Sequence, residues 1–170
     1  MEPYYFRNSK HFPGKSLEYL LFNNSSAFFS LKDRPHREND SMHQHINNLL
    51  KAGDNLNIKY LCPICGQRPV KYLIFRNCSY LSIKLSCCDN EECLQTIKGD
   101  ERDRIIPVKL RSLRQFSKKE NRKKAEQIFR QLLFLRPSSK PEEILKAIVM
   151  DKEKAKPRKA KMIVKQLTLF

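Results

Sequence analysis

The six cysteines of this 170-residue chain constrain its fold most, because all of them lie within the 32 positions from Cys62 to Cys93. The stretch CPICG holds Cys62 and Cys65 with two residues between them, and CDNEEC holds Cys88 and Cys93 with four between them. In a cytosolic chain, clustered thiols favour metal binding over disulfides. The glycine after Cys65 permits the tight turn that points two sulfurs inward. The sequence therefore predicts a closed tetrahedral site of four thiolates, with no open position for chemistry.

The stretch YLCPICGQRPVKYLIF…LSIKLSCCDNEEC resembles the zinc-ribbon family over roughly 40 residues. In that family two cysteine knuckles at the ends of a small β-sheet hold one structural zinc, so the resemblance implies one Zn²⁺ that supplies much of the folding free energy. Cys87 is an alternative to Cys88 as a ligand, and buried thiols without metal are a second alternative. Cys78 is interpreted as a small residue between strands. Three nearby cations are expected to offset the charge of the site: Arg68, Lys71 and Lys84.

Positive charge is concentrated in the C-terminal part of the chain. Residues 101–170 carry 21 Lys/Arg against 8 Asp/Glu, which gives +13 of the total net charge of +16. Such a concentration indicates a polyanionic partner, with a solvated helix and tail as the alternative interpretation. A membrane surface is disfavoured, because the basic segments lack the bulky apolar face of an interfacial helix.

The predicted partner is DNA, with RNA as an alternative. Backbone phosphates are the expected target, and the expected contacts come from one basic helix: Lys118, Lys119, Arg122, Lys123, Lys124 and Arg130. No aromatic residue for base stacking is visible in this helix, which argues against a preference for single strands.

The patterning predicts an α+β protein in four segments. Residues 1–57 form an N-terminal turn-and-helix module, and residues 58–112 form the zinc ribbon with a small antiparallel sheet. Residues 113–153 form a basic helical segment, and residues 154–170 form a flexible basic linker that ends in an apolar peptide.

Capping residues and breakers predict where the elements begin and end. A turn at Gly14 precedes the first helix, Gly53 stops the third, and Pro107 marks an edge strand. Further on, SKKE is a capping box, and a second helix of the basic segment starts with Pro141 in its first turn. The expected N-terminal helix starts are Ser16, then Ser25 or Ser26, then Asp40 or Ser41.

The stretch FPGKSLEYLLFNNSSAFFSL resembles the Gly-Lys-Ser/Thr-Leu module at the C-terminus of exodeoxyribonuclease X-like proteins and in other proteins of DNA metabolism. An earlier Gly-Lys pair and a tryptophan of that module have no counterpart in this chain. The nuclease active site lies outside the module, so the resemblance implies no cleavage activity. The matching positions are Gly14, Lys15, Ser16, Leu17 and Leu20, with Phe28 or Phe29 in the aromatic position.

The sequence predicts a protein that is not an enzyme. The carboxylates needed for two-metal phosphodiester chemistry should recur on strands or facing helices, but here they are scattered over loops. The four glycines are too dispersed for a phosphate-binding loop. His43 and His45 are spaced i, i+2, so they do not share a helix face and are interpreted as surface residues.

The chain given ends in QLTLF, which closely resembles the pentapeptide by which bacterial proteins bind the replicative sliding clamp. The resemblance implies that Leu167, Leu169 and Phe170 enter a cleft of the clamp, while Gln166 fixes the register. The alternative is that MIVKQLTLF forms a last β-strand on the core. Clamp binding by such a peptide would be weak alone and useful when DNA contacts raise its effective concentration.

Together these features predict a DNA-binding accessory protein of bacterial DNA replication, repair or mobile-element processing. The alternatives are an RNA-binding or transcription-type zinc-ribbon protein and a non-catalytic subunit or inhibitor of a nuclease complex. No apolar run approaches the roughly 20 residues of a membrane span. The first ten residues lack the layout of a secretory signal, so the expected location is the cytoplasm, in association with the nucleoid.

Overall fold

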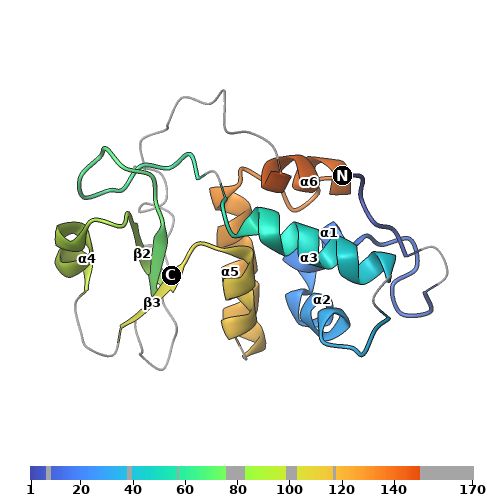
Figure 1. Ribbon diagram of the computed structural model, residues 1–170. Coiled ribbons are helices and arrows are strands. Elements are labelled where there is room, and N and C mark those ends of the chain that lie inside the picture. Colours follow the sequence, from blue (N-terminus) through green and yellow to red (C-terminus); the bar gives the residue numbers. More distant parts are fainter. Residues whose placement is uncertain are drawn as a thin grey trace. The chain divides into compact units, whose positions relative to one another are not determined.

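The computed structural model is an α+β structure with a three-stranded antiparallel sheet, as predicted (Figure 1). The described chain falls into two compact units. We call them the helical unit, drawn from residues 1–57 and 109–152, and the sheet unit, drawn from residues 58–108. The residues that the structure describes are 1–6, 9–37, 40–56, 58–75, 83–98, 103–116 and 118–149.

The N-terminal part of the helical unit consists of α1 (Leu17–Asn23), α2 (Ser25–Lys32) and α3 (Ser41–Gly53). Each begins at a side-chain cap. Ser16 accepts a hydrogen bond from the Tyr19 N–H, Asn24 accepts one from Ala27, and Asp40 accepts from the first turn of α3. These caps satisfy backbone donors that have no partner within the helix. The predicted starts of all three helices are therefore confirmed.

The C-terminal part consists of η1 (Leu110–Gln115), α5 (Lys119–Leu132) and α6 (Pro141–Val149). α1 packs against α2, α5 and α6, while α3 packs against α6 and η1. The N-terminal module and the basic helical segment thus share one core, although the sequence assigned them to separate segments. Each helix has only one apolar stripe, and the stripes of the two segments bury one another. The fully buried apolar side chains include Leu17, Leu21, Phe22, Phe28, Ile46, Leu49, Leu50, Leu110 and Phe129.

Gly53 ends α3, but not through a left-handed backbone. Positive φ among the glycines occurs at Gly14 and Gly66, and α3 closes on Asp54 in the right-handed helical region. A Cβ on Gly53 would lie 2.7 Å from Cβ of Leu110, which is far inside van der Waals contact. Glycine is therefore required at this position by the close approach of η1. The contact joins the two chain segments that flank the sheet unit in the sequence.

α5 begins at Lys119, and its predicted capping box includes Ser117. Lys118 is its N-cap and makes no side-chain cap hydrogen bond. Ser117 lies outside the described residues. α6 begins at Pro141 as predicted, with Glu142 and Glu143 in the first turn, where the helix dipole favours negative charge.

The sheet unit contains β1 (Tyr72–Phe75), β2 (Ile83–Cys87) and β3 (Arg104–Pro107) in the order β2-β1-β3. The N–H of Val108 donates to the carbonyl of Lys71, so the backbone of Pro107 faces away from β1. Pro107 has no N–H and therefore occupies the outer edge of the sheet at no cost in hydrogen bonds. The predicted edge strand is confirmed.

A further helix, α4 (Glu91–Ile97), follows β2 and was not predicted. The Asn90 side chain accepts from the Glu92 N–H, and Glu91 and Glu92 occupy the first turn. None of the described helices is long and apolar enough to cross a lipid bilayer.

Candidate metal centre

The first cysteine pair lies at the tip of a tight hairpin. The N–H of Cys62 donates to the carbonyl of Arg68 at 2.7 Å, and the N–H of Gly66 donates back to the carbonyl of Cys62 at 2.9 Å. Gly66 has φ of 65°, and a Cβ there would have no neighbour within 4 Å. The backbone conformation, rather than lack of space, therefore requires glycine. This hairpin is the first knuckle expected from CPICG.

The second cysteine pair combines a strand end with a helix. Cys88 directly follows β2, and Cys93 lies in the first turn of α4. The chain turns at Asp89 and Asn90 before the helix begins. The helical turn then carries Cys93 back toward Cys88. This explains why four residues separate the second pair, whereas two separate the first.

The four predicted ligands come together. The Sγ atoms of Cys62, Cys65, Cys88 and Cys93 all lie within 4.8 Å of one another, and the Cys65–Cys88 separation is 3.8 Å. A tetrahedral ion with metal–sulfur bonds of about 2.3 Å has sulfur–sulfur edges of about 3.8 Å. Three of the cysteines are buried and Cys65 is partly exposed. These residues lie close enough to hold a metal ion in a closed site.

Among the described residues, the buried cluster around this site is made largely of cysteine. Four of the six residues in the buried cluster are cysteines, and the other two are Ile74 and Ile97. Cys65, Tyr72 and Leu94 pack against this cluster. An ion bound by these cysteines would add to the folding free energy of the sheet unit.

The sulfurs differ in how readily they ionise. Backbone hydrogen bonds from Gln67 and then Arg68 lower the pKa of Cys65 to about 6. Burial raises the pKa of Cys88, and it raises that of Cys93 to about 12. A thiol must lose its proton to bind a metal, so a cation entering the site displaces protons from Cys88 and Cys93.

Cys87 is buried beside this site, but it is not one of the four clustered sulfurs. It ends β2 opposite Tyr72, and burial raises the pKa of its thiol to about 12. The structure thus positions Cys88 as the ligand and Cys87 as a residue of the core. Cys78 lies outside the described residues.

The cations expected to balance the site bind a neighbouring carboxylate instead. Asp89 Oδ1 lies 3.8 Å from an Arg68 guanidinium nitrogen, and Oδ2 lies 3.4 Å from Lys71 Nζ. These groups are about half exposed, so the pairs contribute little to stability individually. They do link the first knuckle to the residue that follows Cys88. The Lys84 side chain is not described.

The six residues predicted to contact nucleic acid do not share one environment. Lys118, Lys119, Lys123 and Lys124 are exposed. Arg122 is partly buried, and its guanidinium lies 3.5 Å from the carbonyl of Phe116.

Arg130 has a structural role in packing. Its guanidinium donates to the carbonyl of Phe22 and, at 2.8 Å, to Oδ1 of Asn23. These groups lie at the C-terminus of α1, where the helix dipole favours a cation. Arg130 therefore binds within the helical unit, and its side chain is occupied there rather than available for the predicted nucleic-acid contact.

Glu126 is a buried carboxylate that the sequence did not identify. It is 4 % exposed, and its Oε1 accepts a hydrogen bond of 2.8 Å from the N–H of Ser25 at the start of α2. Glu126 and Arg130 are spaced i, i+4 on α5, so the carboxylate meets the N-terminus of one helix and the guanidinium meets the C-terminus of another. Charged residues are normally interpreted as exposed, and no local pattern in the sequence distinguishes Glu126 and Arg130 from the exposed charged residues of α5.

The prediction that His43 and His45 are surface residues was wrong. His43 is buried, its Nδ1 lies 3.1 Å from Asp40, and its ring stacks on that of His36 at 3.7 Å between centroids. His45 Nε2 lies 2.5 Å from the fully buried Glu18. Tyr4, whose ring centroid lies 5.8 Å from that of His45, and Glu18 of α1 both contact α3 from distant parts of the sequence. These histidines therefore pair with carboxylates within the unit.

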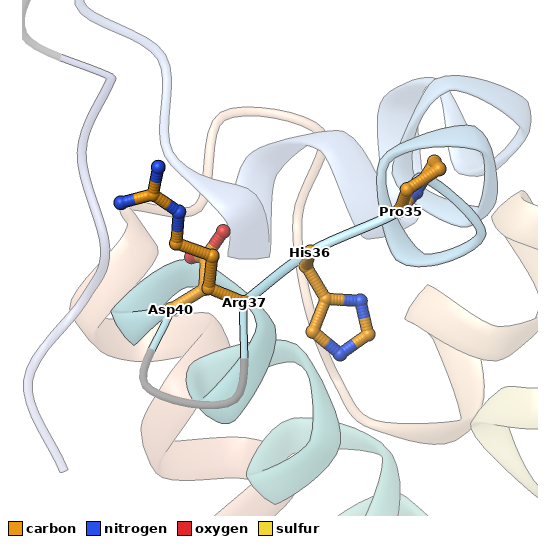
Figure 2. A pocket seen from close by; sticks show the side chains of 4 residues that line it. All are labelled: Pro35, His36, Arg37 and Asp40. Atoms are coloured by element: carbon orange, nitrogen blue, oxygen red, sulfur yellow. The ribbon is translucent and has the colours of Figure 1, made fainter.

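Figure 2 shows a shallow pocket on the segment leading into α3. Its volume is about 780 Å³, and it is lined by Pro35, His36, Arg37 and Asp40. Asp40 is already used as the cap of α3, and His36 is stacked on His43. The described residues at this pocket include no nucleophile and base in hydrogen-bonding contact, so the geometry here supports no catalytic assignment.

The residues that carry the N-terminal resemblance have structural roles. Gly14 has φ of 67°, Ser16 caps α1, and Leu17 is fully buried. Lys15 Nζ lies 4.5 Å from the centroid of the Tyr19 ring, a cation–π contact. The four residues of the clamp-binding prediction, Gln166, Leu167, Leu169 and Phe170, lie outside the described chain.

No family model, curated protein or solved structure matches this chain. The class of the protein therefore rests on its own chemistry. The fold and site define a two-unit α+β protein with a four-cysteine centre able to hold a metal ion.

Proposed function

We propose that this protein is a non-enzymatic, nucleic-acid-binding accessory factor that acts at bacterial DNA and is tethered there by the sliding clamp. The observation that carries the proposal is the exposed lysine group at the start of α5: Lys118, Lys119, Lys123 and Lys124. Within the part of the chain that the structure describes, no ion pair is recorded for any of these four lysines.

Arg111 and Arg114 of the helical unit differ in this respect. Arg111 binds Asp54 through both carboxylate oxygens at 3.0 Å, and Arg114 lies 2.9 Å from Asp33. The lysines of α5 therefore carry positive charge for which no compensating carboxylate is recorded among the described residues. Unpaired lysines release counterions from phosphates without first breaking an intramolecular pair.

Zinc is the ion that we propose for the four-cysteine centre. A closed tetrahedral set of four thiolates is the donor set of structural zinc sites. The ion would stabilise the sheet unit and take no part in a reaction. Elemental analysis of protein purified without added metal should give one zinc per chain, and stoichiometric iron or no metal would contradict the assignment.

The clamp assignment rests on the terminal peptide QLTLF and on its position after a basic stretch. Three large apolar side chains entering a cleft would each contribute roughly 1.5–3 kcal/mol, while ordering each residue costs about 1–2 kcal/mol. The net affinity of the peptide alone is therefore modest. Simultaneous contact between the lysines and DNA would raise the effective concentration of the peptide at the clamp.

Charge reversal tests the nucleic-acid surface. Lys119→Glu with Lys123→Glu should weaken duplex binding at low salt and lower the slope of log K against log salt by about two, because each phosphate contact contributes about 0.9. The matched control is Lys51→Glu with Lys146→Glu, since both are exposed lysines of the helical unit on other helices. Equal effects of the two pairs, measured by fluorescence anisotropy, would mean that only net charge matters. That result would contradict a defined surface.

RNA is the competing ligand, and the same assay separates it from DNA. Duplexes and single strands of DNA and RNA with one sequence should be compared at one salt concentration. Tighter binding to DNA supports the proposal, whereas a preference for RNA supports the alternative of an RNA-binding zinc-ribbon protein.

A further inference from the structure

The N-terminal chain, blue in Figure 1, forms a short two-stranded ribbon with the segment that leads into α1. The N–H of Phe6 donates to the carbonyl of Lys15 at 2.9 Å, next to the antiparallel bridge between Tyr5 and Ser16. Phe6 and Lys15 are therefore opposite each other and lie on one face of the ribbon, whereas Tyr5 lies on the other face. The ring of Tyr4 lies on the Phe6 face, since the two ring centroids are 5.8 Å apart. We call residues 4–6 and 9–16 the N-terminal ribbon.

The turn of the N-terminal ribbon is fixed by its own hydrogen bonds. The N–H of Lys15 donates to the carbonyl of Phe12 at 3.2 Å across Pro13 and Gly14, and Gly14 has φ of 67°. A proline followed by a left-handed glycine is typical of a type II turn. The Ser9 hydroxyl oxygen accepts a hydrogen bond of 3.2 Å from the N–H of Phe12. Both backbone polar groups of Phe12 are therefore bonded, which fixes this residue although its ring is only half-buried.

Three aromatic rings contact one another on the N-terminal ribbon. The ring centroid of Phe6 lies 5.7 Å from that of Phe12 and 5.8 Å from that of Tyr4. All three side chains are half-buried, so each keeps part of its surface exposed. The aromatic residue of α5, Phe129, is fully buried instead. The ribbon therefore provides aromatic surface that the lysine-bearing helix lacks.

The N-terminal ribbon also carries positive charge. The stretch SKHFPGKS, residues 9–16, contains two lysines and no acidic residue. Lys10 and Lys15 are exposed, and neither has an ion-pair partner among the described residues. The Nζ atom of Lys15 lies 4.5 Å from the centroid of the Tyr19 ring, so its charge faces an aromatic ring instead of a carboxylate.

We propose that the N-terminal ribbon binds an unpaired nucleic-acid strand, with bases stacked on Phe6 and Phe12 and phosphates held by Lys10 and Lys15. Exposed aromatic surface beside cations suits this ligand, because every base has a π-face and every nucleotide has a phosphate. A duplex hides the faces of its bases, so the ribbon should select single strands. None of these residues belongs to the lysine group of α5. The inference therefore goes beyond the proposed function and can be tested separately from it.

Phe12→Leu removes the aromatic face while keeping an apolar side chain against Phe6. In the full-length protein, affinity for a 15-nucleotide single strand should fall at least about fivefold, and affinity for the matching duplex should change less than twofold. The matched control is Tyr5→Leu, which removes a ring from the opposite face of the ribbon. Thermal melting should show that both variants are folded. An equal loss of single-strand affinity in the two variants would contradict binding on the Phe12 face.

Lys10→Gln with Lys15→Gln tests the phosphate contacts. The slope of log K against log salt for single strands should fall by roughly 1.4, because each phosphate contact on a single strand contributes about 0.7. The control is Lys51→Gln with Lys146→Gln, which removes the same charge from exposed positions of α3 and α6. An unchanged slope in the ribbon variant, or the same change in the control, would contradict these contacts.

Phe12→Trp gives an independent measurement that needs no loss of function. The chain has no tryptophan, so an indole at this position would be its single fluorophore of that kind. Single strands of DNA or RNA should quench its emission, and the stronger of the two identifies the ligand. The matching duplex should not quench it, and neither should poly-glutamate, an anionic chain without bases.

The outcomes separate this inference from the proposed function. Single-strand quenching in Phe12→Trp, with weaker single-strand binding in Phe12→Leu, supports the ribbon as the binding surface. If neither DNA nor RNA single strands quench Phe12→Trp, or if poly-glutamate quenches it equally, the inference is wrong. In that case duplex binding that depends on Lys119 and Lys123 would still support the proposed function. Loss of the α5 surface with single-strand quenching retained would have the opposite meaning.

Discussion

Cys87 and Cys88 offer a matched pair of substitutions for the metal centre. They are adjacent and both fully buried, yet only Cys88 contributes a sulfur to the four-cysteine cluster. Serine replaces a thiol by a hydroxyl of similar size in each case. The difference between the two variants therefore isolates the contribution of the ligand from the cost of a buried hydroxyl.

Cys88→Ser should cost more than Cys87→Ser, and the cost is large relative to the stability of the sheet unit. Structural zinc supplies about 10–16 kcal/mol in small zinc-dependent folds, so one of four ligands accounts for roughly 3 kcal/mol or more. A unit of about 50 residues has a total stability of roughly 2.5–7.5 kcal/mol. Cys88→Ser should therefore remove much of the stability of the sheet unit. Cys87→Ser buries a hydroxyl without a metal bond and should cost about 1–3 kcal/mol.

Two readouts test this prediction. Elemental analysis after gel filtration should show metal retained by Cys87→Ser and lost from Cys88→Ser. Amide hydrogen exchange should show lost protection across residues 58–75 and 83–98 in Cys88→Ser alone, with the helices of the helical unit still protected. Equal metal loss in both variants, or loss only in Cys87→Ser, would refute the ligand assignment.

Three further predictions concern the titration of the site and the packing of the helical unit. At pH 7, metal added to the metal-free protein should release at least two protons per ion, because burial raises the pKa of Cys88 and Cys93. Metal affinity should therefore fall as the pH falls, and binding that does not depend on pH would contradict this prediction. Glu126→Ala should destabilise the helical unit by about 2–4 kcal/mol, because it leaves the Ser25 N–H buried without its charged acceptor. Glu126→Gln should cost less, and equal thermal stabilities of the two variants and the wild type would contradict the capping role of Glu126. Gly53→Ala should lower the free energy of unfolding by about 1–3 kcal/mol, because the added methyl group overpacks against Leu110. A variant that chemical denaturation shows to be more stable than the wild type would contradict the close approach of Leu110 to Gly53.

The sequence predicted the parts of this structure that depend on local chemistry. A capping side chain and the backbone donors that it satisfies lie within three residues of each other, so Ser16 and Asp40 marked their helices correctly. The first cysteine knuckle is also a local turn, determined by Gly66. The edge strand followed from Pro107, which cannot donate to a ladder.

Features that depend on distant partners were missed. Glu126 and Ser25 are 101 residues apart, and no short window shows that a carboxylate of α5 caps α2. The core shared by the N-terminal and C-terminal helices was missed for the same reason, because its two halves are far apart in the sequence. His45 was read as a surface residue because its partner, Glu18, lies on another helix.

The short helix α4 was missed for a different reason. Its seven residues are too few for a clear apolar period, and its role is to return Cys93 to the metal centre. The wider spacing of the second cysteine pair is the sequence feature that corresponds to this helix.

Clamp binding by the terminal peptide tests the central claim most directly. Purified full-length protein, the same protein without residues 166–170, and the variant with Leu169→Ala and Phe170→Ala should be compared on an immobilised bacterial sliding clamp. The full-length protein should bind at roughly micromolar affinity, about 8 kcal/mol, and the other two should not bind. Metal content, thermal stability and DNA affinity should be the same in all three. Unchanged clamp binding after the deletion, or unfolding of the protein by it, would contradict the account.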